Sequence, residues 1–308
     1  MNIYAAIAAF LIAFVYILFL RRMDIFENEK PIYTFVTFIL GCVFLFLVFV
    51  LQAIWPLQQM FSDDGDLLDR LQFHIIAVAL FEETVKILPF LIMFSFRRIV
   101  NEPFDFIKYA SVGAMGFAAL ENVLYFSKYS LEIVESRAFY TSIMHMFTSS
   151  VIAYQMMYVK YRLNKSAWLG FIPGYLSAVI IHGLYNALIG HQETYFLGIG
   201  LSVGILVLWG RIMNNALNAS PFFDETVLRK TFLAGIYLLL GWGAIFIYSA
   251  FGLLILDGKN KAIQFVQEGI VFGLISGIGL FVALAFPKSE KRRMEILISA
   301  FWTLVLHL

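Results

Sequence analysis

The sequence alternates between apolar blocks of about 20 residues and short polar stretches. An α-helix rises about 1.5 Å per residue, so a helix of this length crosses the hydrocarbon core of a bilayer. Nine blocks have this character. They are Ile3–Leu20, Ile32–Ile54, Leu71–Phe94, Phe104–Phe126, Phe139–Val159, Trp168–Gly190, Tyr195–Met213, Thr231–Leu256 and Ile263–Phe286.

Composition agrees with this division, because 61% of the residues are hydrophobic and only 14% are charged. Soluble domains carry roughly 25% charged residues, so a water-soluble protein is excluded. We predict an all-α, polytopic transmembrane bundle of about nine helices that forms a single membrane domain over residues 1–308. Met294–Leu308 is short for a span and is expected to be a thin tenth helix or an interfacial one.

Basic residues indicate how the chain is oriented, since Lys and Arg are retained on the cytoplasmic side. Of the 22 basic residues, 16 lie in one alternating set of loops, five lie in the other set, and Lys86 lies inside a block. The N-terminus is therefore predicted to lie outside. The basic pair Arg21 and Arg22 follows the first apolar run instead of preceding it, so this run reads as a retained helix and not as a signal peptide.

Ionisable residues inside membrane helices are costly and usually functional. Four consecutive blocks, within about residues 71–190, contain them, whereas the helices of residues 195–308 are nearly bare and have no assigned role. The residues are His74, Glu82, Glu83, Lys86, Glu121, Asn122, His145, His182 and Asn186. At 1.5 Å per residue, the acids and imidazoles in the middle of these blocks lie about 8–17 Å below the outer surface, which predicts one shared layer.

Spacing within each helix suggests the pairings. Glu82 and Lys86 are four residues apart with the acid first, which favours an ion pair and leaves Glu83 free to face the centre, although the two acids could exchange roles. His182 and Asn186 are also four residues apart, so they share one face of their helix. His74 and His191 lie near the outer interface and are interpreted as incidental. Gly170/Gly174 and Gly200/Gly204 have the spacing of helix-packing contacts.

These residues also form motifs in a fixed order. EETVK fits EExxK, FAALEN fits FxxxEN, and the later His145 and HGLYN complete a set that resembles the PrsW family. This family is similar to CAAX prenyl endopeptidases and bacteriocin-processing enzymes. The match covers roughly residues 81–186. Lys86 and Glu121 stand where the wider group often has Arg and His, which favours PrsW and argues against a farnesylated substrate.

The resemblance implies an intramembrane endopeptidase in a prokaryotic plasma membrane. Its substrate would be a membrane-spanning protein, such as an anti-sigma factor in regulated proteolysis. The implied catalytic residues are Glu83, Glu121, His145 and His182, with Asn186 as a helper and Glu82 as the alternative base. The implied partners are this substrate and the lipid bilayer, with no nucleic acid.

Two chemistries fit the residues. A desolvated glutamate can activate water while imidazole and amide groups stabilise the oxyanion, and this metal-free, glutamic mechanism with no cofactor is favoured. The alternative is a zinc site with Glu121, His145 and His182 as ligands and Glu83 as base. A serine nucleophile at Ser149 or Ser150 is disfavoured because hydroxyls in membrane helices mostly bond backbone carbonyls. Rival functions are a proton-coupled transporter or channel and a non-catalytic partner-binding protein.

Overall fold

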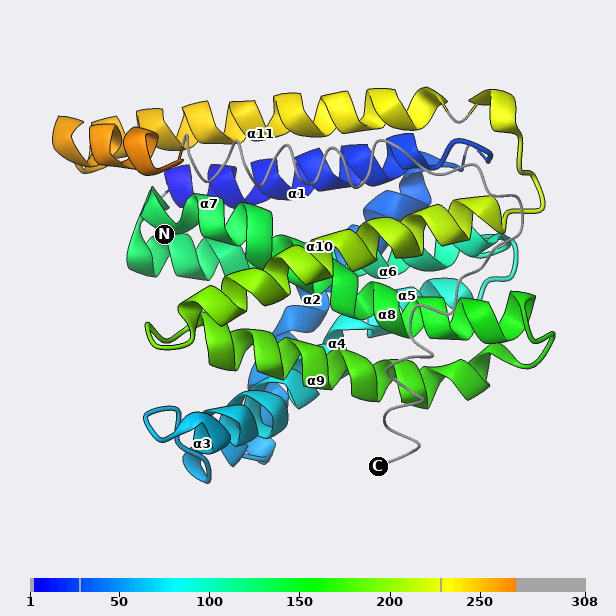
Figure 1. The fold of residues 1–308 in the computed structure, drawn as a ribbon, viewed down its shortest axis with the longest axis horizontal. Helices are drawn as coiled ribbons and strands as arrows, with labels where there is room; N and C mark the ends of the chain where they lie inside the picture. Colours follow the sequence, from blue (N-terminus) through cyan, green and yellow to red (C-terminus); the bar gives the residue numbers. More distant parts are fainter. Residues whose placement is uncertain (1–2, 28, 228, 270–308) are drawn as a thin grey trace.

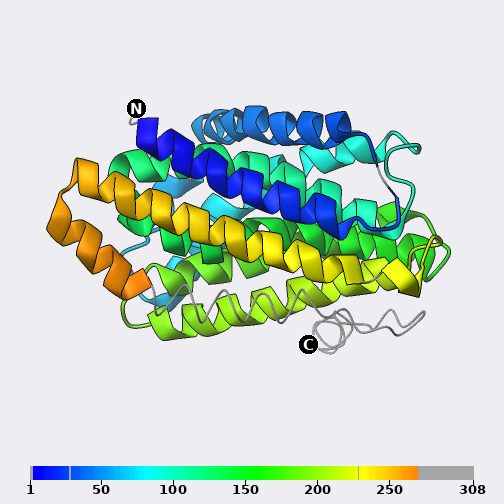
Figure 2. The same cartoon turned by 90° about the horizontal axis from the view of Figure 1, so that it is seen from above.

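The computed structural model describes residues 3–27, 29–227 and 229–269, and every regular element in that part of the chain is helical. The long helices are α1 (Ile3–Met23), α2 (Pro31–Ile54), α6 (Pro103–Tyr129), α8 (Ser142–Tyr161), α9 (Phe171–Ile189), α10 (Tyr195–Asn218) and α11 (Arg229–Leu256). Most of them run roughly along the long axis of the molecule, and α2 crosses the others obliquely in Figure 1 (Figures 1 and 2). Residues 259–269 are also helical. The predicted tenth stretch and most of the ninth block lie outside the described residues.

The sequence predicts one helix for the third span, but the structure divides it into four consecutive helical segments. It consists of α3 (Leu67–Gln72), the π-helical segment η2 (Phe73–Ala79), α4 (Leu80–Lys86) and α5 (Leu88–Phe94). The Asp66 carboxylate begins it by accepting the backbone N–H groups of Leu68 and Asp69, as an N-cap does. Pro89, at the start of α5, lacks an N–H and separates α5 from α4.

Five helical stretches in the described part of the chain are long and apolar enough to cross a membrane. They are Ile3–Met23, Pro31–Ile54, Ala167–Ile189, Tyr195–Asn218 and Lys230–Leu256. The third, fourth and fifth predicted spans do not meet this criterion. Two of them are the charge-bearing α6 and α8, which are buried over most of their length inside the bundle. The prediction of a helical membrane bundle is confirmed.

Helix α6 is the centre of the bundle. It packs against α1, α2 and α8, while α11 covers α1 and α9 covers α8. Helix α10 lies behind α8, where the buried Trp209 indole N–H donates to Ser150 at 3.3 Å. Ser150 also donates to the carbonyl of Met146 and pairs with Ser111. This hydroxyl therefore holds helices together, and α10 supports the helix that carries His145.

Close helix contacts occur at only some of the predicted glycines. A side-chain carbon at Gly170 or Gly174 would collide with the backbone of α8, near Gln155 and Ile152 respectively. Gly200 and Gly204, by contrast, have no neighbour within 4 Å of that position among the described residues. The packing prediction thus holds for the first pair, and the second pair lies on an open helix face.

This difference can be measured as thermal stability in detergent. Gly174→Ala is expected to lower the unfolding temperature, because the added carbon lies 2.7 Å from Ile152 Cα and the two backbones must separate. Gly204→Ala is the matched control on an open face, where alanine favours the helix by up to about 1 kcal/mol. Equal destabilisation by both substitutions would contradict the packing assignment.

An ionic cluster lies at the end of the bundle where α1 ends and α6 begins. The Lys108 ammonium contacts Asp24 at 2.7 Å, Glu29 at 2.8 Å and Asp105 at 2.8 Å. Lys108, near the start of the predicted span Phe104–Phe126, is buried within α6. Its three carboxylates satisfy it there, as a buried cation requires.

Glu102 lies next to this cluster at the start of α6. Its side chain caps the helix and accepts a hydrogen bond from Ser220 at 2.5 Å. Burial raises the pKa of the Glu102 carboxyl to about 8, and the neighbouring Asp105 charge acts in the same direction. The folded protein therefore binds a proton more tightly than the unfolded chain.

The sign of the resulting pH dependence follows from this shift. A raised carboxyl pKa contributes stability that is complete below the unfolded value near 4.5 and is lost as the pH rises through about 8. Glu102→Gln keeps an acceptor but cannot ionise. Its unfolding temperature relative to wild type should rise between pH 5 and pH 9, as measured by thermal unfolding. The exposed Glu193→Gln is the control, and a Glu102→Gln curve parallel to wild type would refute the shift.

Candidate active site

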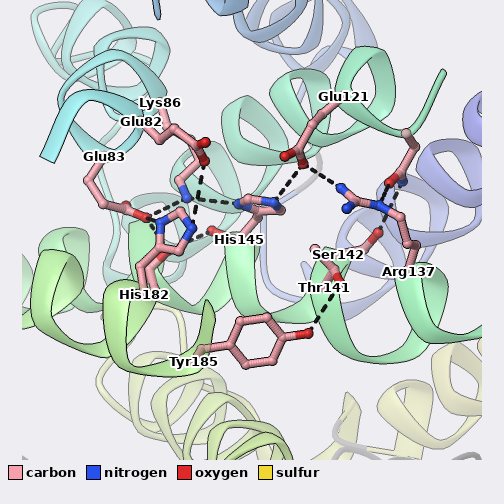
Figure 3. Close-up of polar contacts among 12 residues, drawn as sticks. Glu82, Glu83, Lys86, Glu121, Arg137, Thr141, Ser142, His145, His182 and Tyr185 are labelled. Carbon is pink, nitrogen blue, oxygen red and sulfur yellow. Dashed lines mark hydrogen bonds and ion pairs between the residues drawn. The ribbon is translucent and has the colours of Figure 1, made fainter. Parts of the chain in front are cut away.

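The predicted layer of polar residues is present, and four helices build it. Helix α4 supplies Glu82, Glu83 and Lys86, α6 supplies Glu121, α8 supplies His145, and α9 supplies His182 (Figure 3). Because α6, α8 and α9 pack side by side, residues far apart in sequence lie within hydrogen-bonding distance.

Glu83 is the most heavily bonded acid of the site. Its Oε1 atom lies 2.5 Å from Lys86 Nζ, 2.6 Å from His182 Nδ1 and 3.0 Å from the Thr148 hydroxyl. Its side chain is completely buried, as is that of Lys86. Glu83 is therefore a fixed anion that holds three neighbouring helices in position.

His145 connects this ion pair to Glu121. Lys86 Nζ lies 3.0 Å from His145 Nδ1, and His145 Nε2 lies 2.9 Å from Glu121 Oε2. The same Glu121 oxygen is 2.5 Å from Arg137 Nη2. Arg137 also donates to Asn122 through Nε and stacks over the Tyr125 ring. Glu121 is thus held from both sides (Figure 3).

The donors in this network assign the tautomers of the two imidazoles. The Lys86 ammonium can only donate, so His145 Nδ1 accepts and His145 Nε2 carries the proton that it donates to Glu121. The Glu83 carboxylate can only accept, so His182 Nδ1 carries the proton. In the neutral imidazole, His182 Nε2 then carries a lone pair.

That lone pair faces a second acceptor, Glu82. His182 Nε2 lies 3.6 Å from Glu82 Oε2, and this oxygen has no hydrogen-bond partner among the described residues. Two acceptors at this separation do not bond to each other, but a proton donor or a cation placed between them satisfies both. The Glu82 and Glu121 side chains are 14% and 15% exposed, whereas that of Glu83 is fully buried. Of the two partly exposed acids, Glu121 is bonded to Arg137 and His145, and Glu82 is the one with an unpartnered oxygen.

The balance of charges in the site also singles out Glu82. The site contains three carboxylates, Glu82, Glu83 and Glu121, and two permanent cations, Lys86 and Arg137. Each cation is in direct contact with one carboxylate, Lys86 with Glu83 and Arg137 with Glu121. Glu82 is left without a cation of its own. A site with this excess of negative charge can bind a proton at Glu82, taken from water or from another donor, or it can bind a metal ion there.

The structure differs from the sequence-based expectation in three places. Lys86 pairs with Glu83, three residues away, and not with Glu82, because Glu83 shares its buried side of α4. Arg137, which lies between the predicted spans Phe104–Phe126 and Phe139–Val159, is a buried partner of Glu121. Asn186 is half-buried one turn beyond His182, and its amide makes no hydrogen bond to the other site residues in the described part of the chain.

The carboxylate that joins the two imidazoles in a possible metal-binding group also differs from the sequence-based expectation. Glu82, His145 and His182 each offer a ligand atom within 4.8 Å of the others, and the unpartnered Glu82 oxygen makes these residues fit a metal ion. Glu121, expected as the carboxylate ligand, is instead bound to Arg137 and His145. Two imidazoles and one carboxylate are a common zinc donor set.

Fold and site together define a class: a polytopic helical membrane protein with a carboxylate and imidazole centre buried inside its bundle. Comparison with known proteins narrows this class. A family model described as "PrsW family intramembrane metalloprotease" matches residues 29–213, which include every helix of the site. The chain belongs to this family and is an intramembrane protease of a bacterial membrane.

Three bacterial relatives named protease PrsW support the assignment. The protein from Geobacillus kaustophilus is 25% identical over 180 residues, which cover 58% of this chain and 79% of the relative. The Oceanobacillus iheyensis protein is 25% identical over 58% of this chain and 80% of its own length. The Halalkalibacterium halodurans protein is 27% identical over 56% and 77%. No solved structure matches the chain.

The observed pairing of Lys86 can be tested by double substitution. Lys86→Ala leaves a buried carboxylate without its cation, and such a loss costs about 3–5 kcal/mol. Lys86→Ala combined with Glu83→Gln should recover part of this stability in detergent, because the uncompensated charge is removed. The matched combination with Glu82→Gln should recover less. Preferential rescue by Glu82→Gln would instead support the pairing expected from the sequence.

Proposed function

We propose that the protein hydrolyses a peptide bond of a membrane-spanning protein with a water molecule activated by Glu82. The observation that best supports this proposal is the pair of acceptors Glu82 Oε2 and His182 Nε2, which lie 3.6 Å apart. A water molecule between them donates one hydrogen to each and turns its own lone pairs toward the substrate. This arrangement suits an attacking nucleophile.

A single carboxylate, that of Glu82, can act first as the general base and then as the general acid of the reaction. Glu82 takes a proton from water as the oxygen attacks the carbonyl carbon, which gives a tetrahedral oxyanion. Glu82 then returns the proton to the amide nitrogen as the C–N bond breaks, leaving a carboxylic acid and an amine. Glu82 ends as it began, so no covalent enzyme intermediate is required.

The other polar residues position and stabilise. Glu83 fixes the His182 tautomer, and Thr148 and Lys86 fix Glu83 in turn. Oxyanion donors are each worth about 2.7–4 kcal/mol in well-studied enzymes. We assign this role to Asn186, whose side chain has an amide donor and which shares a helix face with His182. Glu121 orients His145, and Arg137 orients Glu121.

A metal-dependent reaction is the second candidate, and the Glu82, His145 and His182 cluster favours it. These three residues would hold a zinc ion, which would supply Lewis-acid polarisation of the carbonyl and of a bound water. Glu83 would then be the nearest remaining carboxylate, because it bonds directly to the His182 ring. Lys86 opposes this candidate, since its ammonium lies 3.0 Å from a ring nitrogen of His145.

The predicted orientation places the site in the outer half of the membrane. A substrate helix has its carbonyls engaged in backbone hydrogen bonds, so it must unwind before water can attack. Gly, Pro or β-branched residues near the outer end of a substrate span would make this unwinding easier. Regulated cleavage of a signalling protein such as an anti-sigma factor fits this substrate class.

Loss of the base is the direct test of the mechanism. Glu82→Gln should fold normally and lose at least about 10²-fold in turnover, as for removal of a general base. The assay is cleavage of single-span membrane proteins by the purified protein, with products identified by mass spectrometry. Glu193→Gln, an exposed change near the same end of the bundle, is the control. Near-normal turnover by Glu82→Gln would transfer the role to another residue.

Mass spectrometry of the same reaction locates the cut. Fragments should end in the outer half of the substrate span or just beyond it, and a substrate with Gly at that position should be cleaved faster than one with Leu. Cuts at the cytoplasmic side would contradict both the predicted orientation and the assigned site.

A further inference from the structure

A second cluster of metal-binding side chains lies at the predicted outer end of the bundle, separate from the site described above. Asp63 comes from the loop between α2 and α3, His74 from η2, and His191 from the loop between α9 and α10. Their ligand atoms all lie within 4.8 Å of one another. Three segments distant in sequence therefore bring one carboxylate and two imidazoles together.

The geometry within this cluster is that of donors converging on one point. Asp63 Oδ1 lies 2.8 Å from His74 Nε2 and 3.5 Å from His191 Nε2. Zinc binds nitrogen and carboxylate oxygen at about 2.0–2.2 Å in a tetrahedron, so neighbouring ligand atoms lie roughly 3.4 Å apart. Small shifts of two surface loops are enough to reach that spacing.

The cluster is also accessible and only partly used by the fold. The side chains of His74, Asp63 and His191 are 14%, 43% and 27% exposed, so an ion can reach them from outside. His74 Nδ1 is buried without a hydrogen-bond partner among the described residues. Two histidines and an aspartate with room for a water as fourth ligand favour a borderline cation such as Zn²⁺ over Mg²⁺ or Ca²⁺.

We propose that Asp63, His74 and His191 form an outward-facing Zn²⁺ site that fastens η2 to the outer end of α9. Both helices run from this site to the reaction centre. Eight residues separate His74 from Glu82 and nine separate His191 from His182, which is about 12–14 Å of helix in each case. Ile75 also contacts α9 at Gly183, where a side-chain carbon would collide with it. The bound ion thus sets the separation between Glu82 and His182.

Zinc binding can be tested without any cleavage assay. The full-length protein, without a polyhistidine tag, is stripped with a chelator, dialysed and titrated with ZnCl₂ in lipid nanodiscs. Bound zinc is counted by mass spectrometry of the metal, and unfolding temperature is measured with ZnCl₂ and with MgCl₂. Wild type should bind one zinc at this site and gain stability with zinc but not with magnesium.

Variants locate the ion. His191→Ala and Asp63→Asn lie in loops and should each lose one equivalent of zinc together with the zinc-dependent rise in unfolding temperature. Asp64→Asn, the neighbouring exposed acid, and His145→Ala, in the reaction centre, should both keep that equivalent. Equal zinc in His191→Ala and wild type would overturn the proposal. Zinc lost only from His145→Ala would do the same and would assign the metal to the reaction centre.

The effect of zinc on cleavage rests on the proposed function, but zinc binding does not. If Glu82→Gln abolishes cleavage and His191→Ala removes zinc while lowering turnover only in part, both proposals stand. If His191→Ala removes zinc and leaves cleavage unchanged, the ion binds without setting the Glu82 and His182 separation, and the coupling is refuted. Cleavage by Glu82→Gln at the wild-type rate refutes the mechanism alone.

Discussion

The buried ammonium of Lys86 decides the direction of the hydrogen bonds at the reaction centre. It donates to Glu83 and to His145, so Glu83 stays an acceptor and His145 must direct its proton toward Glu121. The Glu83 anion in turn orients His182, and Arg137 secures Glu121 from the other side. The bonds of Glu83 Oε1, His145, His182 Nδ1 and Glu121 Oε2 are set in this way, whereas Glu83 Oε2 and Glu82 Oε2 are buried without a hydrogen-bond partner among the described residues.

Much of this arrangement was predictable because membrane spans have a strong sequence signal. Length and hydropathy located the helices, and the cost of charge in lipid singled out the acids and histidines that the structure then brings together. Depth counting predicted one shared layer for these side chains, and the structure joins Glu82, Glu83, Glu121, His145 and His182 in one connected cluster. The order of the motifs pointed to the family that the comparisons establish.

What could not be predicted depends on rotation about helix axes and on loops that fold back. The choice between Glu82 and Glu83 as partner of Lys86 turns on about 100° of rotation, and spacings of three and four residues are both compatible with an ion pair. Arg137 lies in a segment between two spans, and only its position in space shows that it returns to Glu121. His74 lies in η2 and His191 lies in the loop after α9, so no local pattern connects them.

The π-helical segment η2 has a consequence for how the two adjacent acids came to differ. Such a segment amounts to a single extra residue in an otherwise α-helical span. If the same residues were wound as a regular α-helix, everything beyond η2 would turn by about one residue's rotation, and Glu82 would take the direction now held by Glu83. The division of labour between a structural anion and a reactive one is therefore a matter of helical phase. An insertion or deletion in η2 therefore changes which acid faces the open side of the site only where the winding of this segment does not change with it.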